Sequence, residues 1–278
     1  MILVTGATGN VGRHVVSQLL PTGAAIRALT RRPETAGLPD GVEVVRGDLA
    51  EPDTLPSALA GVTDVFLFPV PGKGPAFVEA AKASGVRRVV LLSSSAVRDD
   101  LDRQPNPIAE FHADVERAIE ESGLEWTFVR PGGFATNTLQ WAPQIRDGGV
   151  VRGPYAAAAI PLIHEADIAA VAVKALTSDG HAGARYPLTG PEAVTQAEQV
   201  RIIGAAIGRE TRYEEVPPEI AREQLARHVP LPIVDALLGF WARAVDRPSP
   251  VLPTVAEVTG RPARTFREWA ADHAADFR

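Results

Sequence analysis

The stretch MILVTGATGNVGRHVV, residues 1–16, decides the fold. Apolar residues 2–4 lead directly into three glycines, Gly6, Gly9 and Gly12, and apolar residues at helical spacing follow. A short strand that ends in a glycine-rich turn and opens a helix is typical of the first unit of a doubly wound α/β fold. In such a unit Gly6 makes the tight turn, Gly9 lets the backbone approach a bound group, and Gly12 lets the helix pack closely.

The first 130 residues continue this alternation. Strands are expected at residues 2–5, 25–30, 42–46, 64–68, 88–93 and 126–130, and helices at 10–20, 54–60, 75–84 and 108–122. Strands such as DVFLF (64–68) are almost entirely apolar, as parallel strands covered on both faces are. The pattern predicts right-handed βαβ units and a Rossmann-type doubly wound parallel sheet.

Beyond residue 131 the rhythm loosens, and two glycine- and proline-rich segments, 130–137 and 146–164, are expected to be loops. A helix is expected at 167–176 with Asp167 as its N-cap, together with a strand at 185–189 and helices at 195–207, 218–227 and 265–277. We therefore expect an NAD(P)-binding Rossmann domain at 1–150. A mainly substrate-binding lobe is expected at 151–278, with residues of about 160–190 returning to the sheet.

Composition excludes several classes of function. The 28 Lys and Arg against 34 Asp and Glu give a net charge of −6 with no long basic block, which disfavours nucleic acid as a partner. The absence of cysteine excludes disulfides, thiolate metal sites and a cysteine nucleophile. The six histidines are scattered, so no metal site is expected, and no G-x-S-x-G elbow for serine hydrolysis is present. With no targeting segment or membrane-length apolar run, we expect a cytoplasmic monomer or homodimer.

The glycine turn predicts a dinucleotide, because the N-terminus of the following helix offers unpaired N–H groups to a pyrophosphate. The residue that reads the adenosine ribose is expected at the end of the second strand, where Thr30 is followed by Arg31 and Arg32 and no carboxylate occurs before Glu34. Two guanidinium groups favour a 2′-phosphate. NADP(H) is therefore preferred over NAD(H), although one of the two arginines is expected to be only solvated.

Two further positions follow the third strand. Asp48 and Leu49 are placed to flank an adenine, the carboxylate toward its amino group and the leucine against its face; a plain helix-entry aspartate is the alternative. The other expected cofactor contacts lie at the ends of the strands and in the turns that follow them. The full expected set is Gly6, Thr8, Gly9, Asn10, Val11, Gly12, Arg31, Arg32, Asp48, Leu49, Phe68, Pro69, Ser93, His112, Pro131, Gly132, Gly133 and Phe134.

The motifs TGATGNVG (5–12), RGDL (46–49), RRVVLLSSSA (87–96), SGLEWTFVRPGGF (122–134) and HEADIAAVA (164–172) resemble those of the NmrA-like branch of the atypical short-chain dehydrogenases/reductases. The resemblance covers most of the chain and is weakest at residues 218–260. It implies a Rossmann domain with a small C-terminal lobe. Members include NAD(P)H-dependent reductases of quinones, triarylmethane dyes, aromatic ethers and isoflavones, and also redox-sensing regulators without turnover.

Reductases of the wider family use a serine and a Tyr-x-x-x-Lys pair, and this pair is missing here. By the resemblance, Glu116 occupies a glutamate position of the family, His112 falls where the lysine would be, and Ile108 falls where the tyrosine would be. His112 is therefore a candidate general acid or cofactor-ribose ligand, because imidazole titrates near pH 6.5. The alternative is a half-exposed bystander beside an apolar helix stripe.

The remaining candidates lie in loops. Ser95 is the expected catalytic serine, with Ser94 beside it in the substrate pocket, and Tyr155 is a second candidate acid. Phe134, Trp141, Tyr155 and His164 are expected to line or support the pocket. Core packing is an equal alternative for Trp141 and Phe134.

These features predict an NADPH-dependent oxidoreductase for a small conjugated or aromatic acceptor such as a quinone, enone, imine or dye. Such acceptors need little acid assistance, which suits a site without the Tyr–Lys pair. The main alternative is a non-catalytic NADP(H)-sensing regulator that acts through protein contacts. A weaker alternative is cofactor-assisted isomerisation or epimerisation.

Overall fold

The computed structural model describes residues 1–278 and divides them into two compact units. The first comprises Met1–Pro105, Ala109–Pro131 and Glu165–Leu188, and the second comprises Asn106–Ile108, Gly132–His164 and Thr189–Arg278. The chain thus leaves the first unit at Pro131, before the expected boundary at residue 150, and Glu165–Leu188 returns to it. No helix combines the length and the apolar character that crossing a membrane requires.

The first unit is built on a seven-stranded sheet in the order β3-β2-β1-β4-β5-β6-β9, and every neighbouring pair is parallel. Its strands are β1 (Ile2–Val4), β2 (Ile26–Thr30), β3 (Val42–Arg46), β4 (Asp64–Leu67), β5 (Arg88–Leu92), β6 (Glu125–Pro131) and β9 (Ala184–Leu188). This is the expected doubly wound order, and it reverses between β1 and β4. Ligands of such sheets bind at the carboxyl edge of this switch point.

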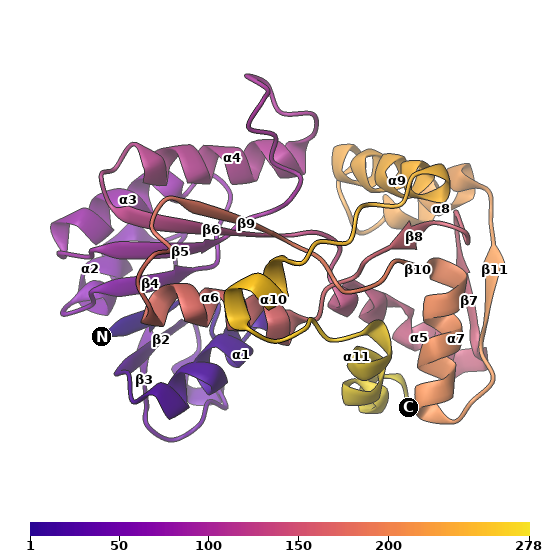
Figure 1. The fold of residues 1–278 in the computed structure, drawn as a ribbon, viewed down its shortest axis with the longest axis horizontal. Coiled ribbons are helices and arrows are strands. Elements are labelled where there is room, and N and C mark those ends of the chain that lie inside the picture. The colour runs from indigo at the N-terminus through magenta and orange to yellow at the C-terminus, as the bar shows by residue number, and fades with distance from the viewer. The chain divides into compact units, whose positions relative to one another are not determined.

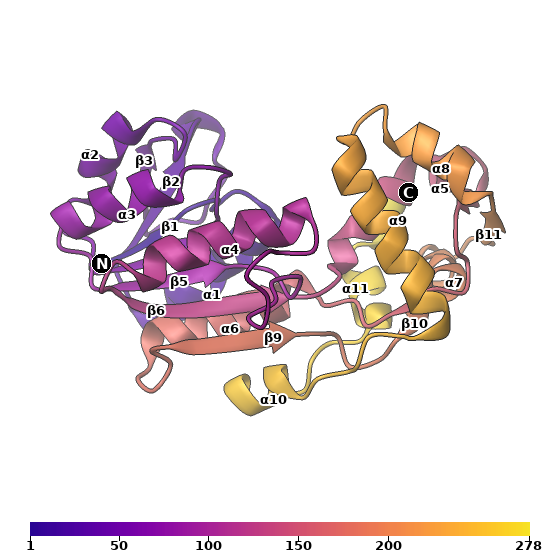
Figure 2. The same cartoon turned by 90° about the horizontal axis from the view of Figure 1, so that it is seen from above.

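Helices cover both faces of this sheet (Figures 1 and 2). On one face α1 (Asn10–Leu19) packs along α6 (Glu165–Thr177), and the other face carries α2 (Leu55–Leu59), α3 (Gly74–Ala83) and α4 (Pro107–Glu120). Because α6 begins at Glu165, Asp167 lies inside its first turn, and the expected N-cap role of Asp167 is wrong. Apolar residues of these helices and strands form the core, with Phe77 and Phe128 among its largest members.

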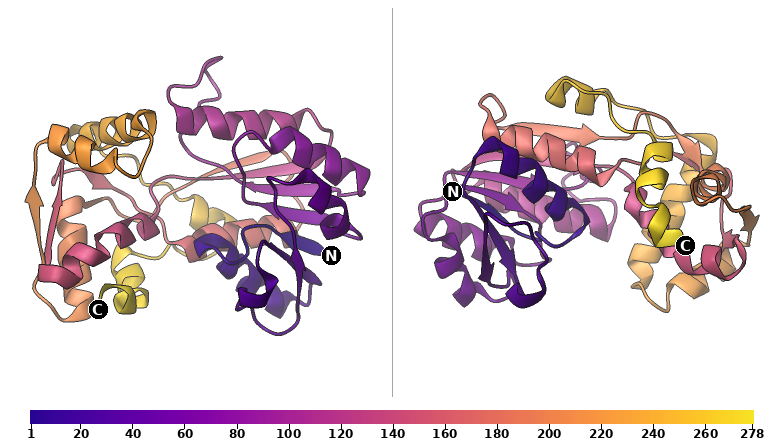
Figure 3. Two further views of the ribbon diagram at one scale, coloured as in Figure 1. Left: turned by 180° about the vertical axis from the view of Figure 1, so that it is seen from behind. Right: turned by 90° about the horizontal axis from the view of Figure 1, so that it is seen from below.

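The second unit contains short elements that the sequence did not reveal. The two segments expected to be loops and the residues between them contain a 3₁₀ helix (Ala135–Trp141), α5 (Ala142–Gly148), β7 (Val150–Gly153) and β8 (Ala159–Ile160). β7 pairs in parallel with β11 (Arg212–Glu215), and β11 packs on α7 (Gln196–Ile207). β8 pairs with β10 (Val194–Thr195). Figure 3 shows the ribbon from two further sides. The remaining helices are α8 (Pro218–Leu225), α9 (Leu231–Asp246), α10 (Thr254–Thr259) and α11 (Phe266–Asp272).

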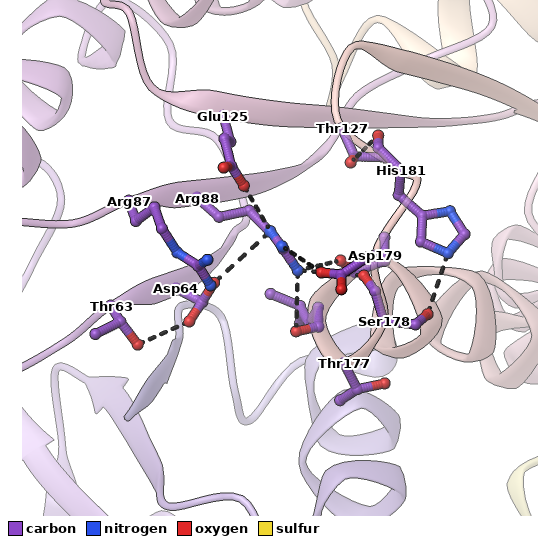
Figure 4. A network of polar contacts seen from close by, with 12 residues as sticks. Thr63, Asp64, Arg87, Arg88, Glu125, Thr127, Thr177, Ser178, Asp179 and His181 are labelled. Carbon is purple, nitrogen blue, oxygen red and sulfur yellow. Dashed lines mark hydrogen bonds and ion pairs between the residues drawn. The ribbon is translucent and has the colours of Figure 1, made fainter.

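A polar network stabilises the amino edge of the sheet (Figure 4). Arg88, the first residue of β5, has Nε 3.3 Å from Oε2 of Glu125 and 3.8 Å from Oδ1 of Asp64. Its Nη1 donates to three carbonyl oxygens at the end of α6, those of Ala175 at 3.1 Å and of Leu176 and Ser178 at 3.4 Å. Asp179 lies 3.7 Å from its Nη2. We call Arg88, Asp64, Glu125, Asp179 and these carbonyls the amino-edge network.

Candidate functional site

The glycine turn after β1 has a geometry that only glycine can adopt. Gly6 has a φ of +60°, and a Cβ on Gly12 would lie 2.1 Å from the Gly6 carbonyl oxygen. The same oxygen accepts a hydrogen bond of 2.9 Å from the Gly9 amide. The turn is therefore folded tightly on itself, with Thr8, Gly9 and Asn10 exposed.

The start of α1 fits a bound phosphate. Gly9 is its N-cap, no side chain caps it, and no acidic residue occurs in its first turn. Arg13 donates from Nη2 to the Thr8 carbonyl oxygen at 2.9 Å, which adds a positive charge beside the turn. Free amide N–H groups, the helix dipole and a guanidinium all favour an anion at this point. The residues expected to hold a pyrophosphate are therefore compatible with one.

The two arginines after β2 are exposed, and neither guanidinium forms an ion pair with the protein. Arg27, on the same strand, behaves differently, because its Nε lies 3.0 Å from a carboxylate oxygen of Glu43. Arg31 and Arg32 therefore retain their full hydrogen-bonding capacity for a phosphate. This suits the 2′-phosphate of NADP(H).

Phe68 lies at the switch point of the sheet. Its side chain packs against the glycine turn, since a Cβ on Gly6 would lie 2.9 Å from the Phe68 Cβ and 3.1 Å from its Cγ, and the residue is still 49% exposed. Its amide donates to Oγ1 of Thr5 at 2.7 Å, which links the carboxyl ends of β1 and β4. A large exposed aromatic ring at this position offers an apolar surface to a ligand.

Asp48 and Leu49 differ in how well they suit an adenine. Leu49 lines a small, mainly apolar recess together with Leu67, Pro69, Val70, Lys73, Gly74, Phe77 and Val115. Asp48 instead accepts a hydrogen bond of 2.8 Å at Oδ1 from the Ala50 amide, as a turn-forming aspartate does. The local role weighed for Asp48 is therefore present, and its contact with adenine stays a prediction.

The three serines after β5 have distinct environments. Ser93 is buried, and its hydroxyl donates to Oε1 of Glu116, so its proton is already engaged within the protein. Ser94 is half-buried and accepts from the Ala96 amide at 3.2 Å. Ser95 is exposed, and its amide donates to the Pro131 carbonyl oxygen at 3.0 Å. Of the three, Ser95 has the most accessible hydroxyl.

His112 is half-buried on α4, and its Nδ1 is buried without a hydrogen-bond partner. Burial lowers the pKa of His112 from 6.5 to about 4, so the ring is neutral at pH 7. A lowered pKa disfavours the cationic form of the ring near neutral pH, and the role of His112 as general acid or cofactor-ribose ligand stays a prediction. A neutral ring with an unsatisfied nitrogen is instead suited to a hydrogen bond with a ligand.

Tyr155, in the second unit, is the one non-glycine residue with positive φ, at +55°. Its carbonyl oxygen accepts hydrogen bonds from the Ala158 amide at 2.9 Å and from Nε2 of Gln196 at 3.1 Å. Gln196 also donates to the Pro154 carbonyl at 3.0 Å. This buried amide side chain, which the sequence analysis missed, helps to hold Tyr155 in an unfavourable backbone conformation, a feature that often accompanies function.

The other candidates of the second unit are mainly structural in their contacts. Trp141 is 7% exposed and packs edge-on to Tyr213, so it belongs to the core of this unit. His164 is 2% exposed, with Nε2 3.3 Å from Oδ2 of Asp272. Phe134 is half-buried and bridges to Ile163. A pocket-lining role for Phe134 and His164 stays a prediction, and for Trp141 the structure shows the core-packing alternative.

The described chain contains no group of three or more His, Cys, Asp or Glu side chains that could hold a metal ion. The carboxyl edge of the sheet instead gathers the glycine turn, Phe68, the serine turn and α4. Arg130, at this same edge, was missed by the sequence analysis. The available signal was a charged residue within the otherwise apolar end of a strand, in FVRP (128–131).

Comparison with known proteins agrees with this architecture. A family model described as NAD(P)H-binding matches residues 6–179. The chain is 44% identical over 282 residues to a (4-alkanoyl-5-oxo-2,5-dihydrofuran-3-yl)methyl phosphate reductase of Streptomyces griseus, covering 100% of this chain and 99% of that protein. It is 40% identical over 288 residues to an NAD(P)H azoreductase of Xenophilus azovorans, covering 100% of this chain and 99% of that protein.

A solved structure of an NADPH-dependent reductase has the same fold as this chain. An NADPH-dependent quinone oxidoreductase of Escherichia coli superimposes with a TM-score of 0.81 at 27% identity, over 98% of this chain and 99% of the other. The same enzyme has been solved with NADPH. These findings confirm the predicted fold, the NADP(H) cofactor and the enzyme class, an NAD(P)H-dependent reductase. The chain belongs to the NAD(P)H-binding family, in the NmrA-like branch of the atypical short-chain dehydrogenases/reductases.

Proposed function

We propose that this protein is an NADPH-dependent reductase of small, electron-poor conjugated acceptors, with enones as the first class and quinones, imines and dyes as related ones. The name of the Streptomyces relative describes a ring double bond conjugated to carbonyl groups, and this relative is 44% identical along the whole chain. Other relatives include an azoreductase and a quinone oxidoreductase. What these acceptors share is a π system that accepts hydride readily.

The observation that carries the proposal is a half-buried His112, whose Nδ1 has no hydrogen-bond partner, in a site without the family's Tyr–Lys pair. A carbonyl that becomes an alkoxide needs a proton donor in the transition state. A conjugated acceptor spreads the charge over its π system and depends less on such a donor. With a pKa of about 4, His112 is better suited to donate or accept a hydrogen bond than to act as a cationic acid.

In this proposal the first unit holds the cofactor. The amides at the start of α1 bind the pyrophosphate, and Arg31 and Arg32 bind the 2′-phosphate. His112 Nδ1 hydrogen-bonds a ribose hydroxyl or the substrate, and Ser95 orients the acceptor. NADPH, when bound, supplies the hydride, and one proton from water completes the two-electron reduction.

The test follows NADPH absorbance with purified protein and a panel of one cyclic enone, one benzoquinone, one azo dye and one triarylmethane dye. Turnover of the enone or quinone is the expected result. Tight NADPH binding without turnover of any of these acceptors would contradict the proposal and favour the sensing regulator. His112→Ala and His112→Gln then test the hydrogen bond, and glutamine should retain more activity than alanine. The pH profile of wild-type activity should contain no limb near pH 6.5 that either substitution removes.

A further inference from the structure

A buried polar network lies at the carboxyl edge of the sheet, centred on Arg130 near the end of β6. Arg130 donates from Nε to Oε1 of Glu116 at 2.9 Å and from Nη2 to Oε2 at 2.5 Å. Nη1 and Nη2 donate to the two carboxylate oxygens of Asp99 at 2.8 and 2.7 Å. Ser93 donates its hydroxyl proton to Oε1 of Glu116. We call Ser93, Asp99, Glu116 and Arg130 the carboxyl-edge clamp.

Most of the clamp is removed from water. Ser93 and Glu116 are 3% exposed and Arg130 is 6% exposed, whereas the Asp99 side chain is 58% exposed. A buried ion pair contributes little net stability compared with apolar side chains of the same volume, because both charges lose their hydration. The clamp therefore offers little advantage in stability. Its distinctive property is direction, since a planar guanidinium fixes each carboxylate through two parallel bonds.

The clamp connects three segments that carry candidate site residues. Ser93 directly precedes Ser94 and Ser95. Glu116 lies one helical turn after His112 on α4, and residues four apart share a helix face. Arg130 directly precedes Pro131, whose carbonyl accepts from the Ser95 amide at 3.0 Å. One guanidinium thus fixes the serine turn, the helix of His112 and the end of β6.

We propose that Arg130 is a positioning residue that, through Glu116 and Asp99, holds His112 and the serine turn in register for hydride transfer. This inference rests on the proposed reductase function and adds a determinant of its rate. Arg130 and Glu116 do not touch the acceptor. They act by keeping the groups that do so within the small tolerance that reaction geometry permits.

The experiment compares Arg130→Lys, Glu116→Gln and Asp99→Asn with wild type, using NADPH and the best acceptor of the panel. Arg130→Lys keeps the charge but loses the planar fork, and Glu116→Gln keeps the shape but loses the charge. We expect each of these two to lower kcat by about 100-fold, the cost of a misplacement of about 1 Å. The Kd for NADPH should change by less than about tenfold, because the pyrophosphate and 2′-phosphate contacts are untouched and no more than the single His112 hydrogen bond is lost.

Arg88→Met in the amino-edge network is the matched control, because it destabilises the same sheet without touching the clamp. It should lower the free energy of unfolding and leave kcat unchanged below its unfolding temperature. Wild-type kcat in folded Arg130→Lys and Glu116→Gln would overturn the proposal and make the clamp purely structural. A loss of kcat in Arg88→Met as large as that in the clamp variants would overturn it equally, since stability alone would then explain both.

Two provisions keep the result interpretable. If the buried variants do not fold, Asp99→Asn tests the proposal instead, because the Asp99 side chain lies at the surface. A kcat lowered by about tenfold supports the proposal, and a wild-type kcat overturns it. If wild type reduces no acceptor, the proposed function fails. The positioning of His112 by Arg130 is then tested by NMR, from the resonances of the His112 ring. These should shift on NADPH addition in wild type and not in Arg130→Lys, and identical shifts in both would reject the positioning role.

Discussion

Arg88 and Arg130 occupy neighbouring strands of one sheet, at opposite edges, and their surroundings differ in kind. Arg88 donates hydrogen bonds to the carbonyl oxygens at the end of α6 and forms ion pairs with carboxylates at the start of neighbouring strands. Arg130 donates four hydrogen bonds to two carboxylates, those of Glu116 and Asp99, and Glu116 also accepts a hydrogen bond from a serine hydroxyl. The first arrangement satisfies a helix terminus, and the second fixes three segments that lead to candidate site residues. The same side chain therefore has a stabilising task at one edge and, in our proposal, a positioning task at the other.

The largest expected effect breaks the amino-edge network. Arg88→Met leaves the three carbonyl oxygens at the end of α6 without their donor, and the Arg88 side chain is only 11% exposed, whereas Asp64 keeps its ion pair with Arg87 at 3.4 Å. We expect the free energy of unfolding to fall by about 3–5 kcal/mol, because each buried acceptor left without a partner costs about 1–3 kcal/mol. Urea unfolding measures it. Arg87→Met, at a neighbouring side chain that is 59% exposed, should cost less than about 1 kcal/mol, and equal losses for the two would refute this account.

The second prediction concerns ligand binding at the carboxyl edge. Replacing Arg31 and Arg32 together by alanine should weaken NADPH binding by about 100-fold, because each charge-assisted hydrogen bond contributes about 1.5–3 kcal/mol. NADH binding should change by less than about twofold, since NADH lacks the 2′-phosphate. The control is Arg103→Ala with Arg261→Ala, which removes the same charge at two exposed sites. Equal losses for NADPH and NADH would exclude the 2′-phosphate assignment.

The third prediction contrasts one histidine at each edge. Burial holds the pKa of His112 at about 4, below the 6.5 of an unfolded chain, so acid protonates the unfolded state first. His112 therefore destabilises the fold progressively as pH falls from about 6.5 toward 4, and by about 2 kcal/mol at pH 5. Urea unfolding at pH 7 and pH 5 should show a smaller acid loss in His112→Gln than in wild type.

His181, beside the amino-edge network, supplies the comparison. Burial, Lys174 and Arg88 lower the pKa of His181, so its effect has the same sign. His181→Gln should reduce the acid loss less than His112→Gln does, because His112 is the more deeply buried ring. An unchanged acid loss in His112→Gln would mean that the ring titrates normally in the folded protein.

The sequence predicted the first unit well because its signals are local. Apolar runs mark the strands, and Val42–Arg46 was placed without error. The spacing of Gly6, Gly9 and Gly12 reports a backbone contact that forms within seven residues, so it can be read directly. Local patterns of this kind require no knowledge of distant partners.

The helices expected at 195–207, 218–227 and 265–277 correspond to α7, α8 and α11 of the second unit, but the clamp and the other elements of that unit could not be predicted in the same way. Arg130 meets Asp99 across 31 positions and Arg88 meets Ala175 across 87, and no periodicity encodes such pairs. The two-residue strands β8 and β10 are too short for an alternating pattern. α9 has apolar residues on most of its faces and therefore lacks the stripe that identifies a surface helix.

The smallest expected effects come from one surface aspartate in each network, and they sharpen the contrast most directly. Asp179 has a fully exposed side chain 3.7 Å from Arg88, and Asp179→Asn should change neither stability nor kcat measurably. Asp99 is also largely exposed, but its two oxygens are fixed by the Arg130 fork, so Asp99→Asn should lower kcat by about tenfold with little loss of stability. The measurement is kcat with NADPH beside a urea unfolding curve for each variant. If neither substitution changes kcat, the two edges do not differ in function, and Arg130 has the same purely stabilising role as Arg88.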